Sequence, residues 1–123
     1  MKRILCFDLD NVICTTNKKK NYAKSKPKKN IIKFINNLYE TNKYQIKVFT
    51  ARGMGKFEGK KSLVRKKYYQ LTKKQLKIWG LKYHKLVMFK TSYDLFVDDK
   101  AYGFKKNWYQ DFNKYLWKYK YFS

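Results

Sequence analysis

Short apolar runs alternate along this chain with longer stretches in which apolar residues recur every three or four positions. The short runs predict strands at residues 2–7, 45–50, 85–88 and 95–98. Strands that alternate with helices over short connections are typical of a parallel sheet covered by helices. The pattern therefore predicts one α/β domain over residues 1–123, a three-layer Rossmann-like sandwich with no internal repeat or linker.

The longer stretches predict the helices between these strands. Pro27 suits the first turn of a helix that ends near Asn42, and the second helical region covers residues 60–79. Thr72 is a candidate cap for the second half of that region, and Gly80 a candidate stop. The apolar face of the first helix is predicted to be Ile31, Ile32, Phe34, Ile35 and Leu38.

Two further segments have their own character. Residues 15–26 are rich in Lys and Asn and are predicted to form a basic flap after the first strand. The tail has aromatic and apolar residues at helical spacing, which favours a helix packed on the sheet over a stacking platform for nucleic-acid bases. These tail residues are Trp108, Phe112, Tyr115, Leu116 and Tyr119.

The polar residues that end the first strand carry the most chemical information. Asp8 and Asp10 stand one residue apart directly after an apolar run. A buried carboxylate pair is unfavourable unless it meets a cation, whereas the C-terminal edge of a parallel sheet is where ligands bind. A divalent metal there would account for both acids. A solvated turn or a helix cap is the alternative for this short motif.

Three more polar groups follow in a consistent order. Thr50-Ala51-Arg52 ends the second predicted strand, Lys90 precedes the last one, and Asp98-Asp99 ends it. Strand ends gather at one edge of a parallel sheet, so we expect these groups to converge. An acid pair, a hydroxyl, a lysine and a second acid pair are suited to binding phosphate and magnesium.

This ordered set resembles the haloacid dehalogenase (HAD) superfamily of phosphohydrolases. Asp8 and Asp10 match its first motif, Thr50 the second, Lys90 the third and Asp98-Asp99 the fourth, over roughly residues 3 to 104. The phrases at residues 50–53 and 97–101 are similar to small capless phosphatases of capsule and cell-surface polysaccharide synthesis. The resemblance implies a HAD-like fold with Mg²⁺ as cofactor.

The resemblance also implies roles. Asp8 would be the nucleophile that forms an aspartyl-phosphate, and Asp10 the acid and then the base. Thr50 and the amides of Ala51 and Arg52 would bind phosphoryl oxygens, with Lys90 adding positive charge. The implied Mg²⁺ ligands are Asp8, the backbone carbonyl near Asp10, Asp98 and Asp99.

The chain departs from the family pattern at several positions. Asn11 stands where many members have Gly, and Asn tolerates unusual backbone dihedrals. Gln75 stands where the similar group commonly has Trp, and Phe-Lys-Thr around Lys90 replaces Gly-Lys-Pro. The intervals between the motifs are too short for a cap domain. The rim of an open crevice would then consist of Lys18-Lys19-Lys20, the loop around Arg52 and residues near Lys90.

Some individual roles stay open on the sequence alone. Arg52 would contact either the substrate or the flap, and Lys85 or Lys100 would be substitutes for Lys90. His84, the single histidine, is predicted to be solvent-exposed and not catalytic.

Composition limits the setting. The 123 residues are 44% hydrophobic and 20% aromatic, with no apolar run as long as a membrane helix. We expect a soluble cytoplasmic protein with no membrane partner, in which Cys6 and Cys14 are free or buried thiols. A homo-oligomer is one way to cover the open crevice.

Charge leaves two classes of partner open. The net charge of +23, nearly all from Lys, fits a polyanionic partner as well as steering of small phosphorylated substrates. The leading hypothesis is a Mg²⁺-dependent phosphatase acting on a small phosphorylated metabolite such as a sugar phosphate. The alternatives are a nucleic-acid 3′-phosphatase resembling the phosphatase domain of polynucleotide kinases, and a non-catalytic basic nucleic-acid-binding module.

Overall fold

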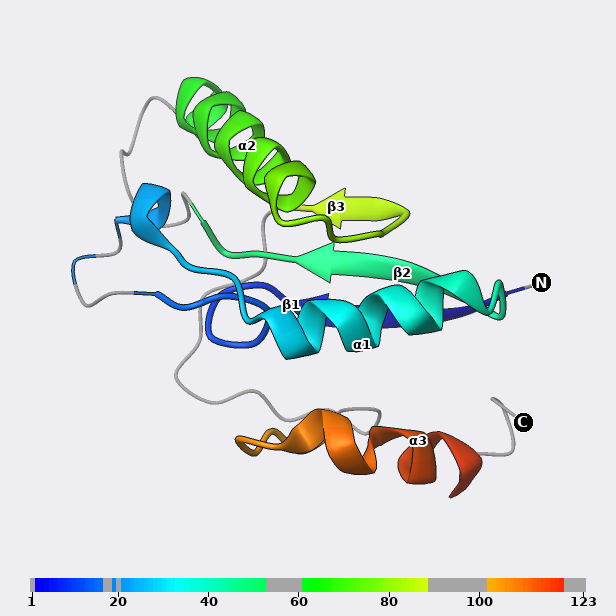
Figure 1. The fold of residues 1–123 in the computed structure, drawn as a ribbon. Coiled ribbons are helices and arrows are strands. Elements are labelled where there is room, and N and C mark those ends of the chain that lie inside the picture. Colours follow the sequence, from blue (N-terminus) through cyan, green and yellow to red (C-terminus); the bar gives the residue numbers. More distant parts are fainter. Residues whose placement is uncertain (1, 17–18, 20, 53–60, 89–101, 119–123) are drawn as a thin grey trace. The chain divides into compact units, whose positions relative to one another are not determined.

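The computed structural model of the chain is shown in Figure 1, in which the described residues are coloured by sequence. They are residues 2–16, 19, 21–52, 61–88 and 102–118. The chain divides into two compact units, Met1–Ser92 and Tyr93–Ser123.

A parallel sheet forms the centre of the first unit. Its strands are β1 (Arg3–Asp8), β2 (Tyr44–Phe49) and β3 (Lys85–Val87), in the order β1-β2-β3. All pairs are parallel, so the three carboxyl ends lie at one edge, as Figure 1 shows. Three predicted strands are thus confirmed to within a residue or so at each end, and the fourth, at 95–98, lies outside the described residues.

One face of this sheet is buried. Leu5 pairs with Ile46 and Phe7 with Val48, and all four side chains are buried, whereas Ile4 is 48% exposed. This alternation is the period of two expected for a strand with one covered face. The sheet therefore has its hydrophobic core on the face of these four residues.

The helices on that face are α1 (Lys29–Glu40) and α2 (Lys61–Ile78). Figure 1 shows α1 running lengthwise along β1 and β2. Both crossovers step in the same direction along the sheet, so their usual right-handed sense places α2 on the same face. The buried residues of α1 are Ile31, Ile32, Ile35 and Leu38. The predicted apolar face is correct except for Phe34, which is half-buried.

The ends of α1 and α2 correct two sequence predictions. Pro27 is not in the first turn of α1, because it bridges Cys14 in an antiparallel pairing that holds the backbone extended before the helix starts. Thr72 caps nothing, since α2 continues through it. Asn42, with φ 58°, and Gly80, with φ 73°, follow the two helices in the left-handed conformation that stops them, as predicted.

The second unit contains α3 (Trp108–Lys118), which confirms the helix predicted for the tail. Its first turns bury Trp108 and Phe112, whose rings meet edge to face with centroids 5.6 Å apart. Tyr102 packs on Phe112 and donates its hydroxyl to the carbonyl of Trp108 at 3.2 Å. The packing of this helix on the sheet stays a prediction.

Two of the three predicted layers are therefore seen in Met1–Ser92, namely the sheet and the helices on one face. The α/β class is confirmed, and the third layer stays a prediction. Within the described ranges, no helix is both long and apolar enough to cross a bilayer.

Candidate functional site

The turn after β1 places Asp10 at the carboxyl edge of the sheet. The carbonyl of Leu9 accepts the N–H groups of Ile13 and Cys14 at 2.9 and 3.2 Å, which closes a tight turn. Asn11 adopts φ 67° inside this turn, so the tolerance expected of Asn at a position usually filled by Gly is confirmed. The turn buries Leu9 and leaves the carboxylate of Asp10 half-buried.

The loop after β2 brings Thr50 to the same place. Thr50 is fully buried, and its N–H donates to the carbonyl of Val87 at the end of β3 over 3.1 Å. Its hydroxyl donates to Oδ2 of Asp10 at 3.3 Å. The structure thus brings the first two motifs together at neighbouring strand ends, as the parallel sheet predicts.

An ion pair with Arg52 dominates the surroundings of Asp10. Nη2 of Arg52 lies 2.9 Å from Oδ1, and Nε lies 3.1 and 3.2 Å from the two carboxylate oxygens. Thr16 donates its hydroxyl to Oδ1 at 3.1 Å. Asp10 therefore accepts hydrogen bonds on both oxygens, and Arg52, a residue that is 1% exposed, has its countercharge.

The other side of the guanidinium faces α2. Nη1 donates to Oγ1 of Thr72 at 3.1 Å and to Oε1 of Gln75 at 2.6 Å. Both acceptors are buried. Sequence reasoning missed these two functions: Thr72 was expected to be a cap, and Gln75 was noted only as a departure from Trp.

Arg52 also contacts the flap. Its guanidinium carbon lies 4.7 Å from the ring centroid of Tyr22, and Nη2 donates to Oγ of Ser25 at 3.4 Å. Of the two roles left open for Arg52, contact with the flap is the one seen in the structure. The side chain of Arg52 itself is too buried to form part of a crevice rim, and residues 53–60 of the predicted rim loop lie outside the described residues.

The amide of Arg52 has a local partner as well. It donates to Oγ1 of Thr50 at 3.1 Å, so this N–H, predicted to bind a phosphoryl oxygen, closes the loop on itself. Ala51 lies half-buried between these two residues.

A buried thiol lies beside the ion pair. Sγ of Cys14 is 3.6 Å from Oδ1 of Asp10 and 3.6 Å from Nη2 of Arg52. Burial, followed by the charge of Asp10, raises the pKa of Cys14 to about 12 although Arg52 acts in the opposite direction. The thiol is therefore protonated at neutral pH and unsuited to be a nucleophile. Both cysteines are free thiols, as predicted.

Asp8 is the last residue of β1 and is half-buried. Its Oδ1 accepts the N–H of Leu9 at 3.0 Å. Among the described residues, no three His, Cys, Asp or Glu side chains gather closely enough to hold a metal ion. Lys90, Asp98 and Asp99 lie outside those residues, so the predicted magnesium set is represented only by Asp8 and Asp10.

The donor chemistry at these two acids bears on how Mg²⁺ would be held. Carboxylate oxygens are hard ligands of the kind Mg²⁺ prefers, and Asp8 carries its carboxylate at the carboxyl end of β1. Both side-chain oxygens of Asp10 are engaged by Arg52. The donor set thus agrees with Asp8 binding through its side chain and Asp10 through its backbone carbonyl.

His84 is exposed, as predicted, and has a structural role. Its Nδ1 accepts the N–H of Ile46 at 2.9 Å, and its own N–H donates to the carbonyl of Ile46 at 2.8 Å. The ring stacks on Tyr39 with centroids 4.5 Å apart. His84 therefore extends the pairing of β2 just before β3.

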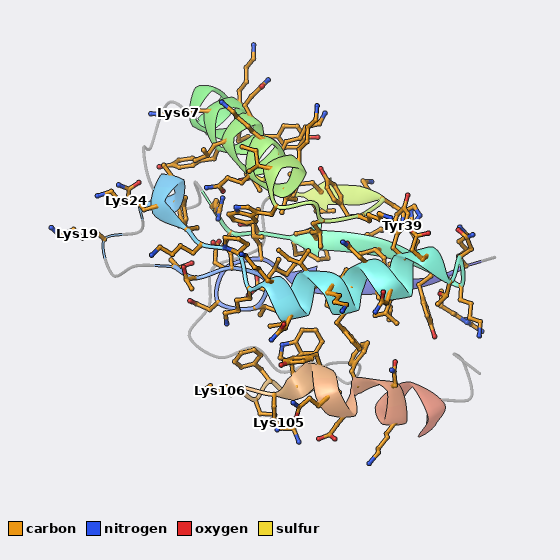
Figure 2. The ribbon with its side chains drawn as sticks, viewed as in Figure 1. Lys19, Lys24, Tyr39, Lys67, Lys105 and Lys106 are labelled. Atoms are coloured by element: carbon orange, nitrogen blue, oxygen red, sulfur yellow. The ribbon has the colours of Figure 1, made fainter. Side chains whose placement is uncertain are left out.

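Exposed lysines surround the carboxyl edge of the sheet. Figure 2 shows Lys19, Lys24 and Lys67 at the same end of the first unit, on the flap, the short 3₁₀ helix η1 (Tyr22–Lys24) and α2. Among the acids described in this unit, only Glu40 is exposed; it ends α1 and pairs with Lys82. The described surface near Asp10 is therefore positively charged.

Comparison with known proteins gives the fold alone. No family model and no curated protein matches the sequence. The structure is similar to a crystal structure of a structural-genomics target from Vibrio cholerae, with a TM-score of 0.72 and 20% sequence identity. The match covers 92% of this chain and 98% of that chain, so the two proteins share an α/β fold over nearly their whole lengths.

Proposed function

We propose that the protein is a HAD-type, Mg²⁺-dependent phosphomonoester hydrolase that acts on a small phosphorylated metabolite such as a sugar phosphate. One observation carries the proposal. Asp8 ends one parallel strand, Asp10 lies in the turn after it, and Thr50 follows the neighbouring strand and donates to Asp10 at 3.3 Å. Two motifs of the resemblance thus converge where an open α/β sheet binds its ligands.

The reaction would run in two displacements. A carboxylate oxygen of Asp8 attacks phosphorus, a new P–O bond forms, and the bond to the leaving oxygen breaks. Asp10, which must hold a proton before the first displacement, gives it to that oxygen and later takes one from the water that hydrolyses the acyl phosphate. Each step is balanced, because the proton lost by Asp10 in the first returns in the second.

The hydrogen bonds around Asp10 hold its carboxylate in place. Arg52 and Thr16 fix Oδ1 and Thr50 contacts Oδ2, so the carboxylate has one defined orientation. Orientation of this kind accounts for a large part of the rate advantage of a positioned acid or base. When bound, Mg²⁺ would offset the repulsion between the carboxylate nucleophile and the phosphoryl group.

We favour a small substrate because long-range attraction of an anionic metabolite is a sufficient role for the positive charge on this surface. Lys19, Lys24 and Lys67 would raise the local concentration of an anionic metabolite without contacting it. The same lysines, together with the net charge of +23, favour a second candidate, a 3′-phosphatase acting on nucleic-acid ends.

Hydrolysis of a generic aryl phosphate tests the proposal. We expect activity with Mg²⁺, loss in EDTA and recovery on adding Mg²⁺ back. Asp8→Asn should abolish turnover, and Glu40→Gln, which changes an exposed acid at the end of α1, should leave it unchanged. Activity that persists in EDTA, or that no divalent ion supports, would contradict the assignment.

Sugar phosphates, nucleotides and 3′-phosphorylated oligonucleotides, compared by kcat/KM, then separate the two candidates. The first proposal predicts the highest value for a sugar phosphate. A higher value for the oligonucleotides would favour the second.

A further inference from the structure

One buried amide joins the candidate site to the flap. The side chain of Gln75, on α2, accepts from Nη1 of Arg52 at 2.6 Å and donates to the carbonyl of Tyr22 at 2.7 Å. The residue is 8% exposed. The amide oxygen must face the guanidinium and the amide nitrogen the carbonyl, because the reverse orientation would set donor against donor.

The segment that Gln75 holds, residues 21–26, has further attachments. The ring of Tyr22 lies beneath the guanidinium of Arg52 and packs edge to face on Tyr68, with centroids 5.5 Å apart. At the other end, Lys26 and Thr15 pair, with the Thr15 N–H donating to the Lys26 carbonyl at 2.8 Å. The segment is thus fixed at its base by the pairing of Lys26 with Thr15, and its other contacts are with Arg52, with Tyr68 and with Gln75 of α2. We call this set of contacts with Arg52 and Gln75 the seating of the segment.

Asp10 and this segment share one cation. Arg52 binds the Asp10 carboxylate with Nε and Nη2. It contacts the segment where its guanidinium stacks on the ring of Tyr22 and where Nη2 donates to Oγ of Ser25. A planar guanidinium cannot turn toward one partner without disturbing the other. Whatever fixes Arg52 therefore fixes both the carboxylate and the seat of the segment.

We propose that Gln75 is a positioning residue that couples the seating of residues 21–26 to the orientation of the Asp10 carboxylate. This inference rests on the proposed function for its kinetic part only. By linkage the coupling is reciprocal, so a change at Asp10 must also affect the seating of the segment.

Two substitutions separate the two bonds of Gln75. Gln75→Glu keeps an acceptor for Arg52 but sets a carboxylate oxygen against the Tyr22 carbonyl, so it releases the segment. Gln75→Leu removes both bonds and also leaves a buried guanidinium N–H with one acceptor fewer. Gln70→Glu and Gln70→Leu are matched controls, because Gln70 is exposed on the same helix.

Seating is measured by the rate of trypsin cleavage after Lys24, an exposed residue of η1, with products identified by mass. Cleavage after Lys73, exposed on α2, reports unfolding of the whole unit. We expect both Gln75 variants to raise the Lys24 rate about tenfold over the Lys73 rate, and the Gln70 variants to raise it not at all. Asp10→Asn, which leaves the bond between Gln75 and Tyr22 in place, should also raise it, by about threefold.

The kinetic arm uses the aryl phosphate. Gln75→Leu should lower kcat more than Gln75→Glu does, and it should change the pH dependence of kcat. The change in KM should be smaller than the change in kcat. Lys24 rates that follow the Lys73 rates in every variant, or an Asp10→Asn protein that cleaves like wild type, would overturn the coupling. A wild-type protein without phosphatase activity would overturn the proposed function, and the cleavage rates would still decide the coupling.

Discussion

Nη2 of Arg52 lies 2.9 Å from Oδ1 of Asp10, although only 1% of the Arg52 surface is exposed. Asp10, the second acid of the first motif, and Arg52, in the loop after β2, therefore form one buried ion pair. The ion pair therefore contributes to the stability of the fold as well as to any catalysis at Asp10. Removing one partner leaves an uncompensated charge, which is more harmful than removing both.

Breaking the pair should therefore destabilise the protein strongly. We expect Asp10→Ala to lower the free energy of unfolding by about 3 kcal/mol, near the lower end for buried pairs because the side chain of Asp10 keeps 19% of its exposure. Urea denaturation measures this. Adding Arg52→Met to Asp10→Ala should recover part of the loss.

The control is the exposed pair of Glu40 with Lys82. Glu40→Ala should change the free energy of unfolding by less than ~1 kcal/mol, as surface pairs do. If Asp10→Ala proved no more harmful than Glu40→Ala, the ion pair of Asp10 with Arg52 would contribute no more to stability than an exposed pair.

The thiol beside the pair predicts a loss of stability at alkaline pH. The pKa of Cys14 is raised to about 12 in the folded protein from an ordinary value of 9.0, by burial first and by Asp10 second. The unfolded chain thus loses this proton at lower pH than the folded one does. The stabilisation is complete below about pH 9 and declines as the pH rises toward 12.

Unfolding in urea at about pH 8 and about pH 10 tests this. The decline should be steeper for wild type than for Cys14→Ala, which lacks the thiol but keeps Tyr22 and the lysines. An alkylating reagent at neutral pH should label the exposed Cys6 and spare Cys14 until the protein unfolds. Equal slopes for the two proteins, or early labelling of Cys14, would argue against a buried protonated thiol.

Most of the fold could be predicted because its elements are local in sequence. The apolar runs of β1 and β2 and the helical spacing of α1 each specify their own period, so their positions were found to within a few residues. Pro27 was misplaced because its environment is set by pairing with Cys14, a contact of tertiary structure. Propensity alone could not reveal that pairing.

The site divides in the same way. The meeting of Asp10 and Thr50 was predictable, because both follow neighbouring parallel strands. The roles of Thr72 and Gln75 were not predictable, because they depend on which residues of α2 the buried guanidinium of Arg52 contacts in the folded protein. No motif marks such a position. The one available signal was that Arg52 needs a countercharge wherever it is buried.

The backbone at Asn11 gives a further stability prediction. Asn11 adopts φ 67°, a conformation unfavourable for residues with a Cβ and tolerated by Asn. We expect Asn11→Ala to lower the free energy of unfolding by about 1 kcal/mol and Asn11→Gly to leave it within ~0.5 kcal/mol of wild type. Thermal or urea denaturation would reveal the order, and an alanine variant as stable as the glycine variant would be inconsistent with it.

The positive charge of the exposed lysines near Asp10 should raise kcat/KM for an anionic substrate. Replacing Lys19, Lys24 and Lys67 with Gln should lower kcat/KM for a sugar phosphate about two- to fivefold at low salt. The effect should fade as added salt brings the Debye length below ~10 Å. The matched control replaces three exposed lysines elsewhere in the unit, Lys33, Lys43 and Lys77, and should have a smaller effect.

A polynucleotide substrate would behave differently in the same experiment. Binding to single strands would fall with log[salt] at roughly −0.7 per phosphate contacted, and the triple variant would make that slope shallower. Tight oligonucleotide binding of this kind, coupled to release of a 3′-phosphate, would replace the sugar phosphate with a nucleic-acid end as the substrate.

The covalent state of Asp8 tests the central proposal most directly. The protein is mixed with aryl phosphate and Mg²⁺, quenched in acid within the first turnover, digested and analysed by mass spectrometry. We predict a phosphoryl group on the peptide that contains Asp8, absent when EDTA is present and absent from Asp8→Asn. Turnover that leaves Asp8 unmodified, or that survives in Asp8→Asn, would contradict the account.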